Sequence, residues 1–232
     1  MKKKLLLIGL LLVTVITLSG CTKEKEYKTL GELTGIYKLD NISVKLVHIG
    51  EDVSYIIEEE TEEGGSFYQG FSSLDYNNIA TSMDIELKIS KEKILLDDNS
   101  NTFKNGEYKR TSDYEADNII NDFLGIETYK ESSVNGKYIL NDNIAYLVET
   151  SDSSLRLRIV NNRYNVSLDL TKDENGHYII EMFEDKYDLI IDKDKFELKI
   201  DSEDEDVKSN EGTYKKSKDI NKIEIIKYFA FE

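Results

Sequence analysis

Histidine and cysteine, the side chains that most often hold a transition metal or act as nucleophiles, are rare in this chain. Its 232 residues include two histidines, His48 and His177, and one cysteine, Cys21. A zinc or copper site takes most of its ligands from these residue types. We therefore expect no such metal site, no cofactor, and histidines that are exposed or satisfied by a local hydrogen bond.

Dense carboxylates raise the question of calcium, which prefers oxygen ligands. Acidic stretches occur at 58–65, 97–101 and 201–206, and the second of these, DDNSN, is similar to the start of an EF-hand loop. That loop needs glycine at its sixth position and glutamate at its twelfth, whereas counting from the first aspartate gives Thr102 and Tyr108. We interpret the three stretches as solvated loops.

The sequence contains no motif of nucleophilic catalysis, since it has neither G-x-S-x-G nor a glycine-rich phosphate loop. The stretch GGSFYQGF (64–71) places Ser66 beside aromatic residues but has no histidine nearby. We interpret it as a hairpin tip and a contact loop formed by Phe67, Tyr68 and Phe71. Glycoside hydrolysis needs only two carboxylates at a set separation, so a hydrolase remains an alternative among 46 acidic residues.

The first residues of the chain read as an export signal. Three lysines precede an apolar run that is shorter than the ~20 residues needed to cross a bilayer, so residues 1–20 are predicted to be a signal peptide. The run ends in Leu18-Ser19-Gly20-Cys21, which resembles the lipobox of bacterial lipoproteins. The resemblance implies lipidation of Cys21, cleavage before it, and anchoring outside the cytoplasm, with residues 21–32 as a tether. The alternative is an ordinary secretory leader with an incidental cysteine.

The composition of the chain indicates which classes of partner it can bind and what kind of genome encodes it. The formal net charge is −16, and it becomes −19 when the leader with its three lysines is removed. Such a chain is repelled by nucleic acid and by anionic lipid headgroups. We expect cationic or uncharged partners, although the charge can also serve only solubility. Abundant Lys, Ile, Asn, Glu and Tyr without Pro or Trp favour an AT-rich Gram-positive genome.

A repeated segment determines the domain organisation. Placing residues 106–123 over 212–229 without a gap aligns a glycine, a tyrosine, a lysine and an aspartate, and then two isoleucines and a phenylalanine. The stretches GIYKLDN and GKYILND, which begin 101 positions apart, are also similar, and YIIE occurs at both 55–58 and 178–181. We interpret these matches as a tandem duplication, with a first unit at 33–126 and a second at 133–232.

Within each unit, apolar and polar residues alternate, as in DIELKIS (84–90), SLRLRIV (154–160), YNVSLDL (164–170) and KFELKID (195–201). This period of two is typical of half-buried strands, and the short spacing leaves no room for crossover helices. Asn-Gly pairs suit the turns. The predicted fold class is therefore mainly β, with two tandem duplicated antiparallel meander or small-barrel units and a short linking helix.

Each predicted unit begins with Gly-x-Tyr and closes with Gly-x-Tyr-Lys, a pattern that resembles small lipocalin-like barrels. The resemblance implies that the first glycine permits a bend and that the aromatic ring closes one end of the core. It assigns Tyr37, Tyr108, Tyr138 and Tyr214 to packing, with their hydroxyls at the rim. Whether each barrel closes is left open.

The segment 112–125 departs from the strand pattern. Ser112 and Glu115 fit a capping box, and an apolar stripe follows before Gly125, which predicts a helix. Its counterpart, 218–229, contains KIEIIKYF, whose β-branched residues leave a final strand as the alternative to a helix.

Taken together, these features favour a non-enzymatic surface lipoprotein. Its role would be to bind a small apolar ligand inside a barrel, or another envelope protein through loops or strand edges. Two alternatives stay open: a hydrolase of envelope polymers that uses paired carboxylates, and an inhibitor or immunity lipoprotein for a cationic partner. An acidic concentration on one side would favour the latter.

Overall fold

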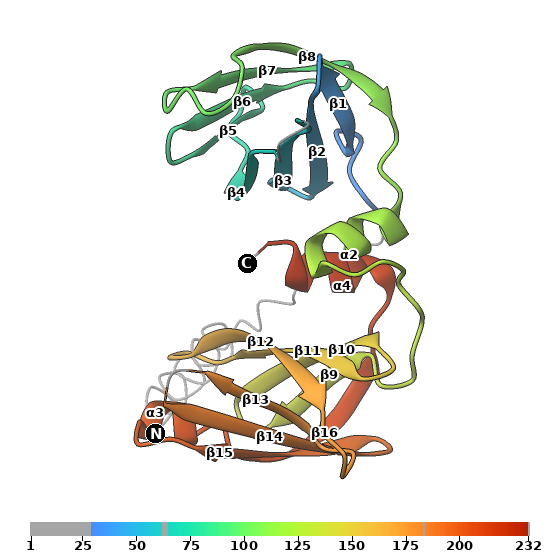
Figure 1. Ribbon diagram of the computed structural model, residues 1–232, viewed down its shortest axis with the longest axis vertical. Helices are drawn as coiled ribbons and strands as arrows, with labels where there is room; N and C mark the ends of the chain where they lie inside the picture. Colours follow the sequence, from blue (N-terminus) through green and yellow to red (C-terminus); the bar gives the residue numbers. More distant parts are fainter. Residues whose placement is uncertain (1–28, 62–64, 183, 232) are drawn as a thin grey trace, which may run out of the picture.

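Figure 1 shows the computed structural model, in which two β units are separated by a layer of helices. The structure describes residues 29–61, 65–182 and 184–231. The predicted signal peptide and Cys21 lie outside the described residues, as does most of the predicted tether. None of the helices in the described ranges is long and apolar enough to cross a membrane.

The first unit is an eight-stranded antiparallel sheet that curls on itself without closing. Its order is β4-β3-β2-β1-β8-β7-β6-β5, so β4 and β5, which are consecutive in the chain, are its two edges. The strands are β1 (Gly35–Leu39), β2 (Ile42–Ile49), β3 (Asp52–Glu59), β4 (Phe67–Ser73), β5 (Ile79–Ser82), β6 (Ile85–Ile89), β7 (Lys93–Asp98) and β8 (Gly106–Ser112).

The second unit repeats this strand order and closes into a barrel, because the strands equivalent to β4 and β5 pair with each other. The predicted fold class is therefore confirmed: mainly β, in two tandem antiparallel units. The strands are β9 (Gly136–Leu140), β10 (Asn143–Ser151), β11 (Ser154–Val160), β12 (Asn165–Lys172), β13 (Tyr178–Met182), β14 (Asp185–Asp192), β15 (Lys195–Asp201) and β16 (Gly212–Asp219).

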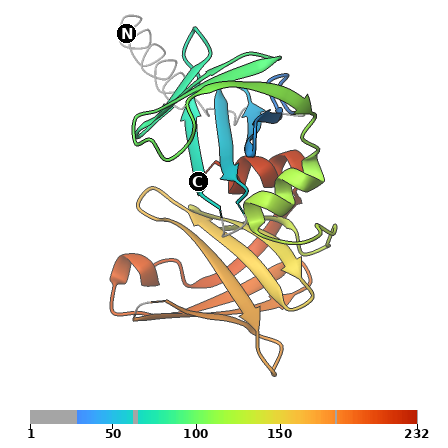
Figure 2. The same ribbon diagram turned by 45° about the horizontal axis from the view of Figure 1, so that its top comes forward.

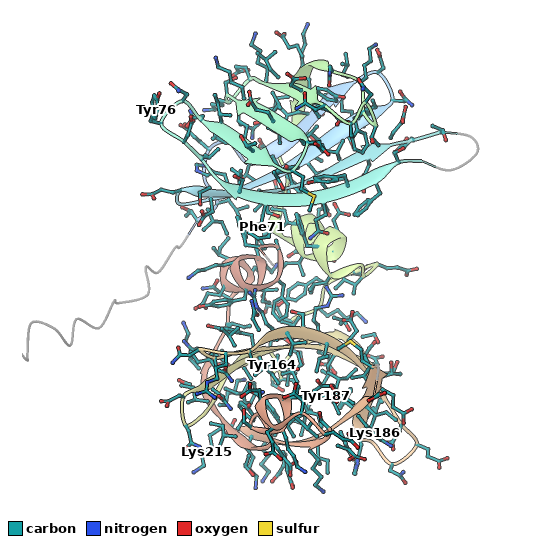
Figure 3. All side chains as sticks on the ribbon, turned by 90° about the vertical axis from the view of Figure 1, so that its left-hand side faces the viewer. Phe71, Tyr76, Tyr164, Lys186, Tyr187 and Lys215 are labelled. Atoms are coloured by element: carbon teal, nitrogen blue, oxygen red, sulfur yellow. The ribbon has the colours of Figure 1, made fainter. Side chains whose placement is uncertain are left out.

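Alternation along the strands builds a separate core in each unit, and side chains fill both interiors (Figure 3). The predicted inward faces are confirmed in β6, β11 and β15, where every second residue is buried. In β12, Leu168 and Leu170 are buried as expected.

The repeated Gly-x-Tyr motif acts in the same way at all four positions. Each tyrosine is buried and donates its hydroxyl hydrogen to the backbone carbonyl four residues earlier, at 2.7–2.9 Å, and burial raises the pKa of Tyr108, Tyr138 and Tyr214 to about 12. A protonated hydroxyl thereby fixes the chain that leads into each of these strands. The tyrosines are Tyr37, Tyr108, Tyr138 and Tyr214.

The basic residue two positions after the closing tyrosine also acts alike in both units. Arg110 donates to the carbonyl of Glu32 and pairs with Asp113 at 2.9 Å. Lys216 donates to the carbonyl of Ser133 and pairs with Asp219 at 2.5 Å. The recurring sequence therefore ties the last strand of each unit to the segment before its first strand.

Helix α2 (Ala116–Leu124) follows the first unit and α4 (Lys222–Phe229) follows the second, and the two pack together between the sheets (Figure 2). The predicted helix thus exists and ends at Gly125, but its predicted capping box is wrong, because β8 still includes Ser112 and no side chain caps α2. The suggested final strand is also wrong. A capping box of Asn221 and Glu224 begins a helix there instead.

One apolar cluster joins the two units. It combines the inner stripes of α2 and α4 with the outer faces of β2, β3 and β10, and includes a Tyr146–Tyr228 stack with ring centroids 3.6 Å apart. Lys45 of β2 pairs with Asp122 of α2 at 3.1 Å. The outer face of each sheet is thus partly covered by the helices.

Part of the sequence similarity is unrelated to the duplication. The first YIIE lies in β3 and the second in β13, whereas β3 corresponds to β11 in strand order. That match is coincidental.

Candidate functional site

Strand β4 is an edge of the sheet in the described residues, and along its outer side a side chain donates to one backbone group, the Ser73 carbonyl, which accepts from Ser72 Oγ at 3.1 Å. At its ends, Glu59 N donates to Ser66 O at 3.0 Å and Leu74 N donates to Glu51 O at 2.7 Å. Since hydrogen-bonded pairs alternate along an antiparallel ladder, the even-numbered residues from 66 to 74 bind β3. The N–H and C=O groups of Phe67, Gln69, Phe71 and Ser73 therefore point away from the sheet.

The same residues carry large apolar side chains into solvent. Phe67 is 63% exposed and Phe71 is 52% exposed, whereas Gly70 is buried and Tyr68 packs against the core. Phe71 is the cross-strand partner of Ser54, whose hydroxyl donates to the carbonyl of Ala230 beyond α4. The exposed rings thus continue the sheet face that the helices cover only in part (Figure 3, where Phe71 is labelled).

Strand register shows which residues of the second unit correspond. Tyr37 is connected through Val44 and Ile57 to Tyr68, and the equivalent Tyr138 is connected through Ala145 and Ile159 to Val166. Tyr68 therefore corresponds to Val166 of β12.

The pattern of β4 is inverted relative to β12. Inside the barrel, Gly70 and Ser72 stand where the second unit has Leu168 and Leu170. On the outside, aromatic residues of β4 replace polar ones at two positions, Phe67 for Asn165 and Phe71 for Asp169, and the position between them stays polar, with Gln69 for Ser167. Core packing explains β12 but not β4, which points to a different use of β4.

We call the border between the edge strands β4 and β5 of the first unit the seam. Strand β5, on the other side of the seam, also carries smaller inward side chains than its equivalent in the second unit. Following the register from β8 through β7 and β6 shows that Ala80 and Ser82 of β5 correspond to Tyr178 and Ile180 of β13. At these four inward positions the first unit therefore has Gly70, Ser72, Ala80 and Ser82, and the second unit has large apolar side chains.

The turn before the seam is identical in the two units. Asp75 N donates to Ile79 O at 3.1 Å, and Asp173 N donates to His177 O at 2.7 Å, with each aspartate accepting two further backbone N–H groups. In the second unit pairing continues at Thr171 with Ile179. In the first unit β4 and β5 remain neighbours after the turn, but the sheet order has no ladder between them.

Tyrosine side chains occupy the border of the seam. The hydroxyls of Tyr68 and Ser82 lie 3.2 Å apart, across the gap between β4 and β5. Tyr55 is fully buried, and its hydroxyl has no hydrogen-bond partner among the described residues. A Cβ at Gly70 would lie 2.8 Å from this hydroxyl oxygen, so glycine in the edge strand is what allows Tyr55 to approach.

Charge is also unequal between the units. Residues 46–87, which include β3, β4 and β5, contain ten acidic residues and no Lys or Arg. The equivalent residues 147–189 contain nine acidic and five basic residues. The seam of the first unit therefore lies in a segment without basic residues, and the exposed side chains of Tyr76 (95%) and Met83 (90%) flank β5.

The predicted contact residues are close to this seam, but their predicted setting is wrong. Phe67, Tyr68 and Phe71 belong to strand β4 rather than to a hairpin tip. Phe67 and Phe71 are exposed as expected, whereas Tyr68 faces inward. The missed signal was the spacing of the two phenylalanines by four, which keeps them on one face of a strand.

The residues considered for metal binding have structural roles. His48 Nε2 lies 2.9 Å from the carbonyl oxygen of Gly50, and His177 pairs with Asp188 at 3.1 Å. In the described ranges no group of three or more His, Cys, Asp or Glu residues could hold a metal ion.

The acidic loops also have local functions. The carboxylate of Asp98 is buried and accepts hydrogen bonds from Ser100 N, Ser100 Oγ and Phe103 N at 2.6–2.8 Å. Burial opposes ionisation of Asp98, but these bonds outweigh it and lower its pKa. Asp204 caps the short helix α3 (Glu205–Lys208). The two loops thus fold around their own carboxylates.

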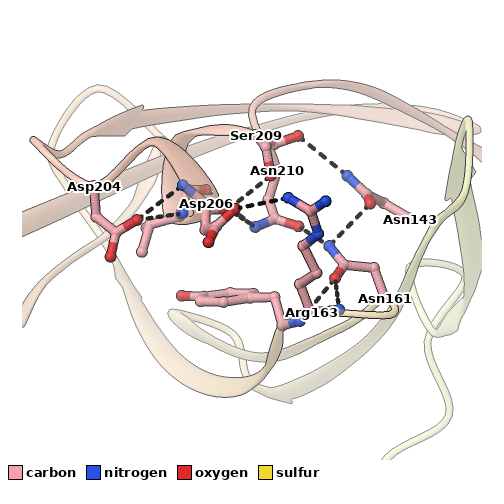
Figure 4. A network of polar contacts seen from close by, with 9 residues as sticks. Asn143, Asn161, Arg163, Asp204, Asp206, Ser209 and Asn210 are labelled. Carbon is pink, nitrogen blue, oxygen red and sulfur yellow. Dashed lines mark hydrogen bonds and ion pairs between the residues drawn. The ribbon is translucent and has the colours of Figure 1, made fainter.

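A polar network closes one end of the second barrel (Figure 4). Asn161 donates to the side-chain oxygens of Asn143 and Asn210, at 3.0 and 2.8 Å, and accepts from the backbone N–H of Arg163 and Tyr164. These bonds connect β10, the β11–β12 turn and the segment after α3.

Cavities occur at the junction of the units. One of about 360 Å³ is lined by both units and α4, including Asp52, Tyr146, Arg158 and Tyr228. Its polar groups are engaged, since Arg158 donates to the carbonyl of Tyr228 and Asp52 accepts from Ser73 Oγ. A wider cleft of about 1040 Å³ beside the linker contains Arg156, which is held by Asp169 at 2.7 Å. Both are better explained as features of the junction.

No protein-family model and no curated protein matches the chain. Among solved structures, similarity is found to a DNA polymerase sliding clamp from Pseudomonas aeruginosa, with 8% identity, a TM-score of 0.15, and coverage of 84% of this chain and 59% of that one. A DNA polymerase III beta chain from Streptococcus pneumoniae gives 12% identity, a TM-score of 0.14, and coverage of 80% and 56%. The chain spans less than two thirds of these proteins, and TM-scores of this size carry no conclusion.

Proposed function

We propose that this chain is a lipid-anchored surface protein with a non-enzymatic binding role, and that it binds another protein through β4 of the first unit. The observation that carries the proposal is the inverted pattern of β4, which exposes Phe67 and Phe71 on an unpaired edge while β12 follows the ordinary pattern. Exposed aromatic residues are the side chains that most often anchor protein interfaces. The lipobox supports the anchoring at Cys21.

Two further observations favour a protein partner over the alternatives. Apolar side chains fill both barrel interiors, which gives a ligand inside a barrel less support. A hydrolase needs a carboxyl group whose pKa is raised so that it can act as an acid. The carboxyl pKa values shifted in the described ranges, those of Asp98, Glu107 and Asp173, are lowered. The acidic segment 46–87 favours a cationic partner, as for an inhibitor or immunity lipoprotein.

Site-specific photocrosslinking on intact host cells tests the binding role. A photoreactive residue at position 71 should crosslink to a protein, whereas the same residue at the equivalent position 169 should not. Equal labelling from both positions, or labelling from neither, would contradict the proposal. Metabolic labelling with an alkyne fatty acid tests the anchor, because Cys21→Ser should abolish incorporation.

A further inference from the structure

We propose that β4 binds an extended, cationic segment of its partner as an added β-strand. This inference rests on the proposed function and names the chemistry of the partner. Its first support is the backbone: the N–H and C=O groups of Phe67, Gln69, Phe71 and Ser73 point away from β3, as shown above. An added strand would satisfy them with the same hydrogen bonds that hold the sheet together.

The edge also lacks the protection that proteins ordinarily give to exposed strands. Such edges carry charged residues, proline or bulges that prevent pairing with another chain. β4 has the sequence FYQGFSS, with no charge and no proline, and its register with β3 is continuous. In the second unit the equivalent strand pairs with β13 at Thr171 and Lys172.

The outward side chains of β4 determine which side chains of an added strand would fit beside them. Directly opposed residues on neighbouring strands have Cβ atoms about 5 Å apart, so alternate side chains of the partner would lie against Phe67 and Phe71. Lysine or arginine at these positions can stack over the rings. The inward positions would meet the border formed by Tyr68 and Ser82, next to the unpartnered hydroxyl of Tyr55.

The negative charge of the segment that contains β4 and β5 favours a cationic partner strand. The same charge disfavours a second copy of this chain as the partner. Residues 46–87 hold ten acidic residues and no Lys or Arg, and they form both borders of the seam. Two copies joined edge to edge would bring these acidic segments together. A partner strand with alternating basic and apolar residues complements both the charge and the alternation of β4.

Fluorescence anisotropy with synthetic peptides tests the inference on the full-length chain in mild detergent. The probe is a labelled peptide of alternating lysine and valine, about eight residues long. Two matched peptides serve as controls: one of alternating glutamate and valine, and a lysine–valine peptide with methyl groups on alternate backbone nitrogens. We expect the lysine–valine peptide to bind, the glutamate peptide not to bind, and the methylated peptide to bind at least about tenfold more weakly, because it loses hydrogen bonds at constant charge.

Variants locate the binding. Phe67→Ser combined with Phe71→Ser should weaken binding of the lysine–valine peptide, whereas Leu95→Ser, at a 42% exposed residue of β7 away from the edge, should leave it unchanged. Thermal unfolding confirms that both proteins are folded.

Several results would overturn strand addition. Equal binding of the methylated peptide would show that side chains alone make the contact, equal binding of the glutamate peptide would exclude a cationic partner, and no binding of the lysine–valine peptide would remove the inference. A dimer that the double variant dissociates would identify a second copy as the occupant. Crosslinking from position 71 to another protein would keep the proposed function even where strand addition fails.

Discussion

The two units of this chain share their strand order, their four buried tyrosines and their closing helix, but they differ at the seam between the fourth and fifth strands. β12 and β13 pair after their turn at Thr171 and Lys172, whereas β4 and β5, which are joined by the same kind of turn, are not paired in the sheet order. The difference follows from side chains: leucines hold β12 against its core, and Gly70 and Ser72 cannot do the same for β4. A duplicated fold can thus keep one copy as a closed barrel while the other copy keeps two unpaired edge strands.

The ends of the barrels also differ. In the first unit the buried carboxylate of Asp98 organises the loop after β7, and Phe103 packs into the core. In the second unit Ile200 stands at the position of Asp98, and α3 brings Val207 into the core. Both solutions leave the tyrosine hydrogen bonds intact.

Introducing the small inward residues of β4 into β12 should have the largest effect on stability. Leu168→Gly combined with Leu170→Ser removes two buried side chains from the second core, so we expect a loss of about 4–8 kcal/mol in the free energy of unfolding. Chemical denaturation measures it. Asn165→Phe, on the exposed face of the same strand, is the control and should change stability by less than about 0.5 kcal/mol. Unchanged stability of the double variant would contradict the role assigned to the leucines.

Asp98 should stabilise the first unit in a pH-dependent way. Asp98→Asn weakens the hydrogen bonds to Ser100 and Phe103, and we expect a loss of about 2 kcal/mol at neutral pH. Because the folded-state pKa of Asp98 is lowered, its contribution is present above the ordinary aspartate pKa of about 4 and is lost as the pH falls below it. Unfolding midpoints measured from neutral to acidic pH should therefore converge for wild type and variant. Asp97→Asn is the control.

The tyrosine hydrogen bonds should be worth the same in both units. Tyr37→Phe and Tyr138→Phe each remove one hydroxyl that donates to a carbonyl at 2.8 Å, so each should cost about 1 kcal/mol. Denaturation of the two variants tests the equivalence of the units directly. A loss of stability in only one of the two variants would show that the tyrosine hydrogen bond contributes differently to the stability of the two units.

The exposed phenylalanines should matter least for stability. Phe71→Ser alone should change the free energy of unfolding by no more than about 0.5 kcal/mol, because the side chain is half exposed and outside the core. Denaturation beside Leu95→Ser measures this. A large loss would mean that Phe71 supports the sheet rather than a partner.

Much of this architecture could be predicted from the sequence, because it depends on local periodicity. The strands KFELKID and SLRLRIV and the helix ending at Gly125 follow from the spacing of apolar residues. The packing role of the tyrosines follows from the repeated Gly-x-Tyr motif and its resemblance to lipocalin-like barrels. The second helix was less accessible, because its β-branched residues favour a strand while Asn221 and Glu224 form the capping box that decides for a helix.

The open seam could not be predicted in the same way. Whether β4 pairs with β5 depends on residues that meet only after folding, and Gly70 and Ser72 become informative only when register places them opposite Leu168 and Leu170. The stretch GGSFYQGF predicts a contact loop, but the position of its aromatic residues on an edge strand required the strand pairing and hydrogen-bond pattern of β3.

Residue-resolved amide hydrogen exchange of the full-length protein tests the central claim most directly. The equivalent amides are those of Ser73 in β4 and Thr171 in β12, because Thr171 pairs with Ile179 while Ser73 has no partner strand on that side. We predict rapid exchange at Ser73, Phe71 and Gln69, slow exchange at Gly70, and slow exchange at Thr171. Equal protection of Ser73 and Thr171 would show that the first barrel is closed in solution and would contradict the account.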